Sequence, residues 1–351
     1  MNLTGTDSTA VKATRLDLLR DSVYLYTKEV YLWNTLLPGY AQFNPRQYSG
    51  ATEIASATNV MNGVRALQPL DRFSFVTSTA AAAGLQTGED VDLGFLIKPA
   101  SIDRAYPIDS VYWFVNYVYA SSPAGKAGVQ RGMMLSKINT TKLDYSNATV
   151  AVLNDIFYGA TTSASFQFIK ADGTALGPIT LTKASYVANS VLYRTVLTSG
   201  AKKVGYVVFN QFFAEPSRKE LGDVFTYFSS QGITDLVVDL RYNGGGSTGT
   251  QDTLANLIAP LSANNKTMYQ YLYNETLQKN EHQLIKKSLG YGNIFSSAGN
   301  TQVFKKAGSL NLSRVFFIVT GSTASASELL INNLKPYMNV QIIGDTTYGK
   351  P

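Results

Sequence analysis

The region between residues 204 and 343 alternates short apolar runs with segments in which apolar residues recur at helical spacing. Strands are predicted over residues 204–209, 236–240, 315–319 and 340–343, and helices over residues 218–229, 248–258 and 326–334. This alternation is typical of a largely parallel sheet covered by helices. Because the carboxyl ends of parallel strands share one edge, we expect the loops after these strands to face one crevice.

Composition narrows the chemistry that such a crevice could perform. The 351 residues include no cysteine and one histidine, His282, in a polar stretch that is expected to form a surface loop. A covalent hydrolase of this composition must work without a histidine-assisted triad unless His282 serves, and serine with lysine is the remaining pair. The 30 basic and 24 acidic residues are spread along the chain, with a net charge of +6, so no nucleic-acid surface is expected. No cofactor is predicted.

Outside the alternating strands and helices, the chain contains segments of a different sequence pattern. Apolar residues three and four positions apart predict an amphipathic helix within residues 11–38, and a second helix is expected over residues 51–67. The Ala- and Gly-rich stretch 79–88 is expected to be a linker or exposed loop. Residues 261–300 are expected to be an insertion near the site, with a hairpin at residues 268–273.

No apolar stretch approaches the ~20 residues that span a bilayer, and the first residues lack a signal-peptide pattern.

Residues 91–170 favour a small β-rich domain, with strands predicted over 93–97, 111–119 and 165–170. Asp92-Leu93-Gly94-Phe95, Ser122-Pro123-Ala124 and Arg131-Gly132 resemble the carboxylate loop, turn and strand start of a PDZ domain. The resemblance implies that an extended peptide joins a sheet edge, with its terminal carboxylate held beside Leu93, Gly94 and Phe95. Met133 stands where the family usually has Asp. The alternative is a β-domain with turn glycines and no ligand.

Two loops and the last residues carry groups that suit acyl transfer. Asp239-Leu240-Arg241-Tyr242-Asn243-Gly244-Gly245-Gly246 follows a buried strand, and its glycines expose backbone N–H groups that can bind an oxyanion. A tight turn or a phosphate cradle would use the same glycines. Ser325 precedes a predicted helix, where unpaired N–H groups favour negative charge, and Lys350 follows the last predicted strand.

These motifs, in this order, resemble the C-terminal processing (tail-specific) serine peptidases over about residues 93–350. The resemblance implies that Ser325 is the nucleophile and Lys350 the general base, 350 − 325 = 25 residues later. Gly245 and Ala326 would supply oxyanion N–H groups, and Glu328 would orient or tune the dyad. Pro336 occupies the place of an Asp that some members carry.

The resemblance also implies an α/β fold class with three domains. These are an N-terminal helical domain (1–88), a PDZ-like β-rich domain (89–186) and a crotonase/ClpP-like α/β protease domain (187–351). Family members continue past the lysine with further strands, so the last domain is expected to be C-terminally incomplete. A lysine base must be buried to lose its proton, whereas chain ends fray, so poor activity is expected of the 351-residue chain.

The predicted function is that of a serine endopeptidase whose partners are polypeptide substrates with free C-termini. The N-terminal helices resemble those of exported, often lipid-anchored bacterial members, which implies the cell envelope or periplasm. Membrane contact would then come only through an N-terminal anchor that this sequence does not contain. The alternatives are a non-catalytic peptide- or lipophile-binding protein on the same scaffold, and an acyl-CoA-type enzyme on a crotonase-like fold.

Overall fold

The computed structural model describes residues 13–103, 111–290, 294–296 and 299–350. The chain divides into two compact units. Unit 1 contains Met1–Ala81 and Thr267–Val303, and unit 2 contains Ala82–Lys266 and Phe304–Pro351. The residues that the sequence suggested as an insertion therefore belong largely with the N-terminal helices. The bounds of the three predicted domains stay a prediction.

Unit 1 begins with helix α1 (Arg15–Val30), which starts where Thr14 and Asp17 hydrogen-bond to each other's backbone N–H groups. The helix predicted to reach residue 38 is too long, because the backbone of Tyr31 is extended and a short 3₁₀ turn follows. The other helical segments here are η1 (Asn34–Leu36), α2 (Tyr40–Phe43), η2 (Pro45–Gln47) and α3 (Glu53–Arg65). Tyr24 of α1 stacks on Phe43 at a centroid distance of 4.0 Å, and this pair centres the core of the unit.

The second half of unit 1 is tied to α1 by polar side chains. Strand β12 (Thr267–Gln270) pairs with β13 (Thr301–Val303), so the hairpin predicted at residues 268–273 is wrong. Between them lie α9 (Glu275–Gln278) and α10 (Leu284–Leu289). The Asn274 amide donates to the carbonyls of Glu29 and Tyr31, both at 2.8 Å, and its Oδ1 caps α9 by accepting the N–H of Leu277. This one side chain therefore joins two segments that are far apart in sequence.

His282 is buried rather than on the surface, with an exposed fraction of 0%. Its ring lies edge-on against Phe295, in the same region as the buried side chains Leu277 and Ile285. The residues next to His282 in the sequence are polar and suggested a surface position. The apolar side chains that bury it come from other positions of the chain and meet only in the folded structure.

Helix α4 (Thr79–Thr87) contains the boundary between the units, because Ala81 belongs to unit 1 and unit 2 begins at Ala82. The predicted loop is wrong because these residues are helical, but the boundary between the two units does fall within the predicted linker. Alanine is the residue that most favours a helix, and this composition outweighs the glycine at position 84. Among the described residues of both units, no helix is at once long enough and apolar enough to cross a membrane.

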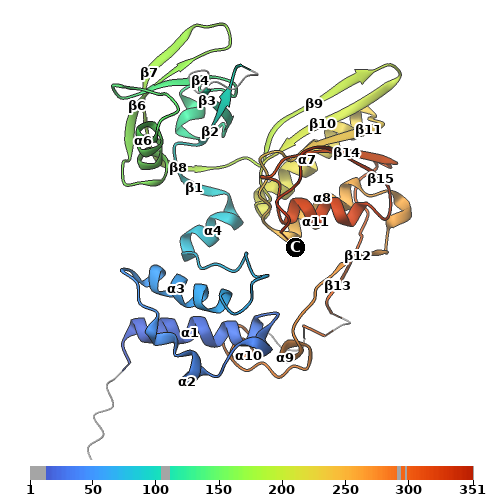
Figure 1. Ribbon diagram of the computed structural model, residues 1–351. Coiled ribbons are helices and arrows are strands. Elements are labelled where there is room, and N and C mark those ends of the chain that lie inside the picture. Colours follow the sequence, from blue (N-terminus) through green and yellow to red (C-terminus); the bar gives the residue numbers. More distant parts are fainter. Residues whose placement is uncertain (1–12, 104–110, 291–293, 297–298, 351) are drawn as a thin grey trace, which may run out of the picture. The chain divides into compact units, whose positions relative to one another are not determined.

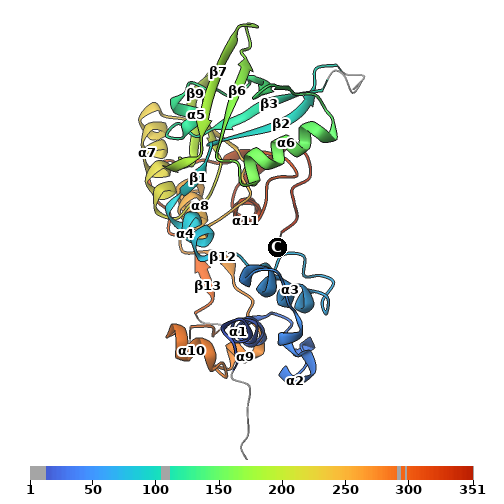
Figure 2. The same cartoon turned by 90° about the vertical axis from the view of Figure 1, so that its left-hand side faces the viewer.

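The β-rich part of unit 2 (residues 89–187) contains a six-stranded antiparallel sheet in the order β2-β3-β4-β6-β7, with β5 beside β4 (Figure 2). Its strands are β2 (Phe95–Ser101), β3 (Val111–Val118), β4 (Met134–Ile138), β5 (Thr141–Lys142), β6 (Ser163–Ile169) and β7 (Ala175–Thr182). Helices α5 (Pro123–Lys126) and α6 (Asn147–Tyr158) accompany it, and β1 (Glu89–Asp92) pairs with β8 (Ala184–Val187). Phe166, Phe168 and Leu135 lie at the centre of its core.

The α/β part of unit 2 contains a five-stranded sheet in the order β15-β14-β11-β10-β9 (Figure 1). Strands β10 (Lys202–Phe209), β11 (Asp235–Asp239), β14 (Arg314–Val319) and β15 (Asn339–Gly344) are parallel to one another, and β9 (Val191–Ser199) is antiparallel to β10. The helices are α7 (Glu215–Gln231), α8 (Thr248–Ile258), η4 (Leu261–Ala263) and α11 (Ala326–Leu334). The predicted parallel sheet is confirmed, and α8 and α11 have the predicted bounds.

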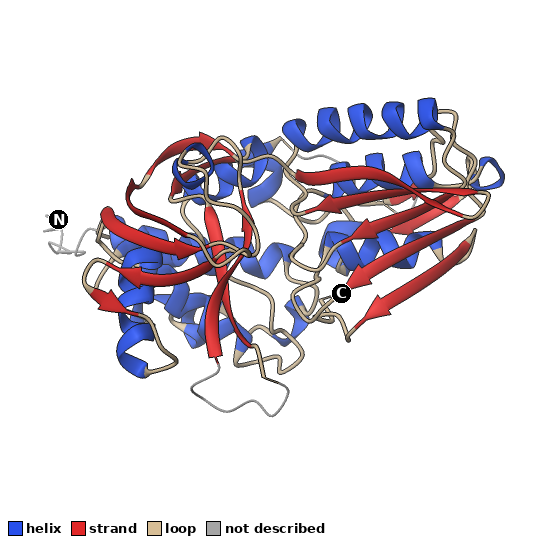
Figure 3. Ribbon diagram, turned by 90° about the horizontal axis from the view of Figure 1, so that it is seen from above, coloured by secondary structure: helices blue, strands red, loops and turns tan. Residues whose placement is uncertain are grey.

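One face of this sheet is covered by helices, which lie alongside the strands in Figure 3. The fully buried residues Val207, Val238 and Phe317 share that face, because the parallel register places them side by side. Phe228 of α7 lies so close to Gly205 on the same face that a side chain at position 205 would contact it. The opposite face carries Tyr206 and Val208, which point the other way along β10.

We predict that Asn274→Ala destabilises unit 1 by about 2–3 kcal/mol, because it removes a helix cap and leaves two buried carbonyls without their amide donor. Hydrogen exchange of α1 peptides in the intact chain would measure this loss locally. The control is Lys287→Ala, since Lys287 is exposed on α10. Equal protection in the two variants would show that Asn274 does not hold the segments together.

Candidate active site

Three loops meet at the carboxyl edge of the five-stranded sheet. The Thr320 hydroxyl donates to the carbonyl of Arg241 at 2.6 Å, and the Thr323 hydroxyl donates to that of Leu240 at 2.8 Å, so the loop after β14 is bonded to the loop after β11. The N–H of Tyr348 donates to the Thr323 carbonyl at 2.9 Å, which adds the loop after β15. The loops expected to face one crevice therefore lie in contact.

Ser325 occupies a sharp turn at the start of α11. Its backbone has φ 58° and ψ −116°, a left-handed conformation that is costly for a residue with a side chain, on the order of 1–3 kcal/mol. The residue is half-buried, whereas Ala324 and Ala326 beside it are buried. A strained strand-to-helix turn of this kind is the geometry that presents a nucleophilic serine in other hydrolase folds.

Gly245 packs directly against this turn. A Cβ at position 245 would lie 2.7 Å from Cβ of Ser325 and 3.0 Å from the N atom of Ala326, and Gly245 has φ +101°, so glycine is required there. Its N–H, however, donates to Asn243 Oδ1 at 2.9 Å and is occupied in this conformation. By contrast, the N–H of Ala326 has no hydrogen-bond partner among the residues that the structure describes. Of the two predicted oxyanion donors, Ala326 is the available one.

Asn243 is a structural centre of the site that the sequence reasoning left without a role. Its side chain is fully buried, accepts from Gly245 and donates to the carbonyl of Phe209 at 2.9 Å. Its carbonyl accepts the N–H of Ala324 and the hydroxyl of Ser327, at 3.1 and 3.2 Å. The available signal was an Asn directly before three glycines, in the loop that follows a buried strand. Ser327 is thus engaged in structure.

Glu328 joins the turn at Ser325 to the segment that ends at Lys350. Its carboxylate accepts the N–H groups of Ser325, Gly349 and Lys350 at 2.8, 2.7 and 2.9 Å, and the hydroxyl of Thr347 at 2.7 Å. Burial acts to raise the pKa of Glu328, but these four hydrogen bonds outweigh it and hold the pKa below its usual value of 4.5. Three of the four contacts are with backbone N–H groups, so Glu328 fixes the positions of Ser325 and Lys350 through the main chain.

Lys350 is held at the site by its backbone N–H, which donates to the Glu328 carboxylate. The residue is half-buried, and its N–H shares Glu328 Oε2 with the N–H of Ser325. Among the described residues, no hydrogen bond joins the Lys350 ammonium to the Ser325 hydroxyl. The structure thus brings the two residues to one carboxylate without placing their functional groups in contact, as is common before a substrate binds.

The predicted carboxylate-binding residues Leu93, Gly94 and Phe95 lie in a tightly packed loop. Leu93 and Phe95 are core residues with exposed fractions of 2% and 6%, and the N–H of Gly94 donates to Asp92 Oδ1 at 2.5 Å. A side chain on Gly94, which has φ +79°, would overlap Ser122. Next to this loop a cavity of about 170 Å³ lies between β2 and α6, bordered by Leu96, Ile97, Trp113, Val150, Leu153, Asn154, Phe157 and Tyr158.

Comparison with known proteins identifies relatives of both sequence and fold. Residues 203–351 match the model of peptidase family S41. The chloroplastic C-terminal processing peptidase of Tetradesmus obliquus is 27% identical over 239 residues, which are 65% of this chain and 46% of that protein. The carboxy-terminal processing protease CtpA of Bacillus subtilis is 25% identical over 232 residues, 65% of this chain and 42% of that protein. The resemblance to C-terminal processing peptidases is confirmed.

The fold has a relative among solved structures. A putative S41 protease from Bacteroides fragilis superposes with a TM-score of 0.64 at 22% identity, over 94% of this chain and 78% of that one. This likeness confirms the predicted α/β protease fold. The chain spans less than half the length of the curated relatives that it matches.

We predict that Glu328→Gln destabilises unit 2 by about 3 kcal/mol at neutral pH, since an amide NH₂ would face backbone N–H donors that now share a carboxylate. The pKa of Glu328 is lower in the folded chain than in the unfolded chain. Its stabilisation is therefore complete above pH 4.5 and is lost as the pH falls through the lower folded value. Urea unfolding of both chains from about pH 3 to about pH 7 would measure the difference.

A difference that stays constant over this range would contradict the role of the Glu328 charge. The matched control is Glu89→Gln, because Glu89 is an exposed carboxylate of the same unit.

Proposed function

We propose that this chain, whose residues 203–351 form a peptidase family S41 domain, hydrolyses peptide bonds through an acyl-enzyme on Ser325. The observation that carries the proposal is the Glu328 carboxylate, which binds the N–H groups of both Ser325 and Lys350. With His282 in unit 1 and no cysteine in the chain, Lys350 is the base that the three-loop site offers.

In the proposed first step, the Ser325 hydroxyl attacks the substrate carbonyl and its proton passes to Lys350. The developing oxyanion is stabilised by the N–H of Ala326 and by the positive end of α11. Gly245 adds a second N–H once that group leaves Asn243 Oδ1. The leaving amine takes the proton back from Lys350, and water then hydrolyses the ester by the same route in reverse.

In a chain extended past Lys350, Ser325→Ala should lower cleavage of an unfolded polypeptide by roughly 10⁴-fold or more and leave the fold intact, because the nucleophile alone is removed. A fluorophosphonate should label the unaltered chain at Ser325, which tests the nucleophile without full turnover. Ser327→Ala is the matched control. Its buried hydroxyl donates to the Asn243 carbonyl, so its loss should reduce the rate less than about tenfold.

Undiminished turnover or labelling of Ser325→Ala would overturn the assignment. The same label separates the alternatives, because neither a non-catalytic binding protein nor an acyl-CoA-type enzyme needs an activated Ser325.

We also propose that the β-rich part captures the free C-terminus of the polypeptide to be cut. Two observations support this. Strand β2 is the end strand of its sheet, so its outer edge can pair with an extended peptide, and the cavity between β2 and α6 lies beside that edge. The peptide carboxylate would replace Asp92 on the N–H of Gly94. A place in the bacterial cell envelope or periplasm stays a prediction.

A peptide with a free C-terminus should bind the chain at least about tenfold more tightly than its C-terminally amidated form, because amidation removes the charge that the loop would hold. Val150→Glu should weaken binding of the free peptide, since Val150 borders the cavity. Ala151→Glu is the matched control, because Ala151 is exposed on α6 outside the cavity. Equal affinity for free and amidated peptides, measured by fluorescence anisotropy, would exclude the carboxylate loop.

A further inference from the structure

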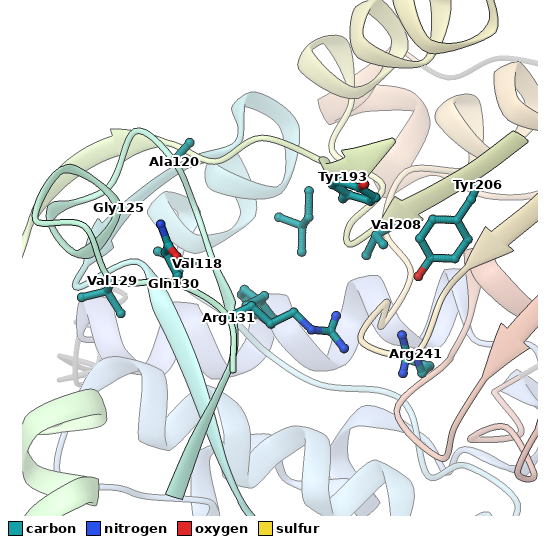
Figure 4. Close-up of a pocket in the computed structure, with 12 residues that line it drawn as sticks. Val118, Ala120, Gly125, Val129, Gln130, Arg131, Tyr193, Tyr206, Val208 and Arg241 are labelled. Atoms are coloured by element: carbon teal, nitrogen blue, oxygen red, sulfur yellow. The ribbon is translucent and has the colours of Figure 1, made fainter. Parts of the chain in front are cut away.

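Unit 2 contains a second and larger cavity, of about 570 Å³, between the β-rich part and the α/β part (Figure 4). It is separate from the cavity of about 170 Å³ between β2 and α6, with which it shares no lining residue. Neither Ser325 nor Lys350 borders it. Its size is within the range of roughly 300–1,000 Å³ that is usual for small-molecule sites.

One wall of the cavity is formed by the sheet face that carries Tyr206 and Val208. Tyr206 and Val208 lie two residues apart in β10 and share a face, and Tyr193 of β9 pairs with Val208 in the register. Strand β10 is hydrogen-bonded on both sides, to β9 and β11. This wall therefore offers aromatic and aliphatic side chains, and its outer strand, β9, is the end strand of the sheet.

The facing wall comes from the β-rich part and also consists of aromatic and aliphatic side chains. Tyr117 and Val118 lie at the end of β3, which is paired with both β2 and β4. Val129 follows from the turn after α5. The facing wall thus adds one aromatic and two aliphatic side chains to the lining.

Two guanidinium groups border this apolar space, and they differ in their partners. Arg241 forms an ion pair with Asp239, with Nη2 at 2.5 Å from Oδ2, and Tyr206 donates to the same oxygen at 2.7 Å. Arg131 extends toward Arg241 and Tyr206 in Figure 4. Arg131 lies over the ring of Tyr242, at 5.3 Å from its centroid, but no carboxylate of the described residues forms an ion pair with it. Arg131 is exposed, and its guanidinium is therefore accessible to a carboxylate that enters the cavity.

We propose that this cavity binds a small amphiphilic carboxylate, whose carboxylate pairs with Arg131 and whose apolar body packs between the two walls. A guanidinium binds a carboxylate with two parallel hydrogen bonds, which gives both affinity and orientation. The aliphatic and aromatic walls gain from covering an apolar body. This site goes beyond the proposed peptidase function and does not depend on Ser325.

The probe is decanoate, with decan-1-ol as a neutral molecule of the same chain length, and binding to the intact chain is measured by titration calorimetry. Decanoate should bind at least about tenfold more tightly than decan-1-ol, because only the carboxylate pairs with Arg131. Equal affinities, or no binding of decanoate at millimolar concentration, would overturn the proposal.

Variants assign the binding to this cavity. Arg131→Ala should reduce the affinity for decanoate to that for decan-1-ol and leave decan-1-ol unchanged, whereas Ala120→Trp should weaken both because Ala120 is an exposed part of the lining. Lys126→Ala is the matched control, since Lys126 is an exposed cation of α5 outside the cavity. Arg131→Gln replaces Arg131→Ala if the latter does not give the circular dichroism of the unaltered chain.

Three results would refute the site. They are undiminished decanoate binding in Arg131→Ala, an equal loss in Lys126→Ala, and Arg131-dependent binding of an acidic peptide in the absence of any decanoate binding. The last result would make the cavity a peptide site. Because the titration does not involve cleavage, failure of the peptidase proposal would leave this test unaffected.

Discussion

The site depends on one buried carboxylate that is fully supplied with hydrogen-bond donors. Taking Glu328 out of water is costly, and the cost is offset because four donors from two separate loops point at its oxygens. Three of these donors are backbone N–H groups, so the charge fixes the path of the chain. The positions of Ser325 and Lys350 follow from that path.

Asn243 also fixes the path of the chain beside the Ser325 turn, but with an uncharged side-chain amide and a backbone carbonyl. Its amide binds the end of β10 and the N–H of Gly245, and its carbonyl binds the start of α11. Together with Glu328 it holds a strained serine between two sets of backbone hydrogen bonds. The strain at Ser325 persists because the surrounding structure determines it more than once.

The parts of the fold that depend on local pattern could be predicted, and those that depend on distant partners could not. The bounds of α8 and α11 follow from helical spacing and from the residues at their ends. The hairpin at residues 268–273 was wrong because β12 pairs with a strand about thirty residues later. In the candidate site, the motifs indicated which residues come together. The engaged N–H of Gly245 depends on the rotamer of Asn243, which no spacing reveals.

The shared carboxylate has a consequence for how the site opens. The N–H groups of Ser325, Gly349 and Lys350 all end on Glu328, so none can reach solvent for long unless that carboxylate withdraws. Their amide protons belong to one cooperative opening event, although they lie some 25 residues apart (350 − 325) in sequence. Loss of either the turn at Ser325 or the segment that ends at Lys350 would take donors away from Glu328, so each of the two segments stabilises the other.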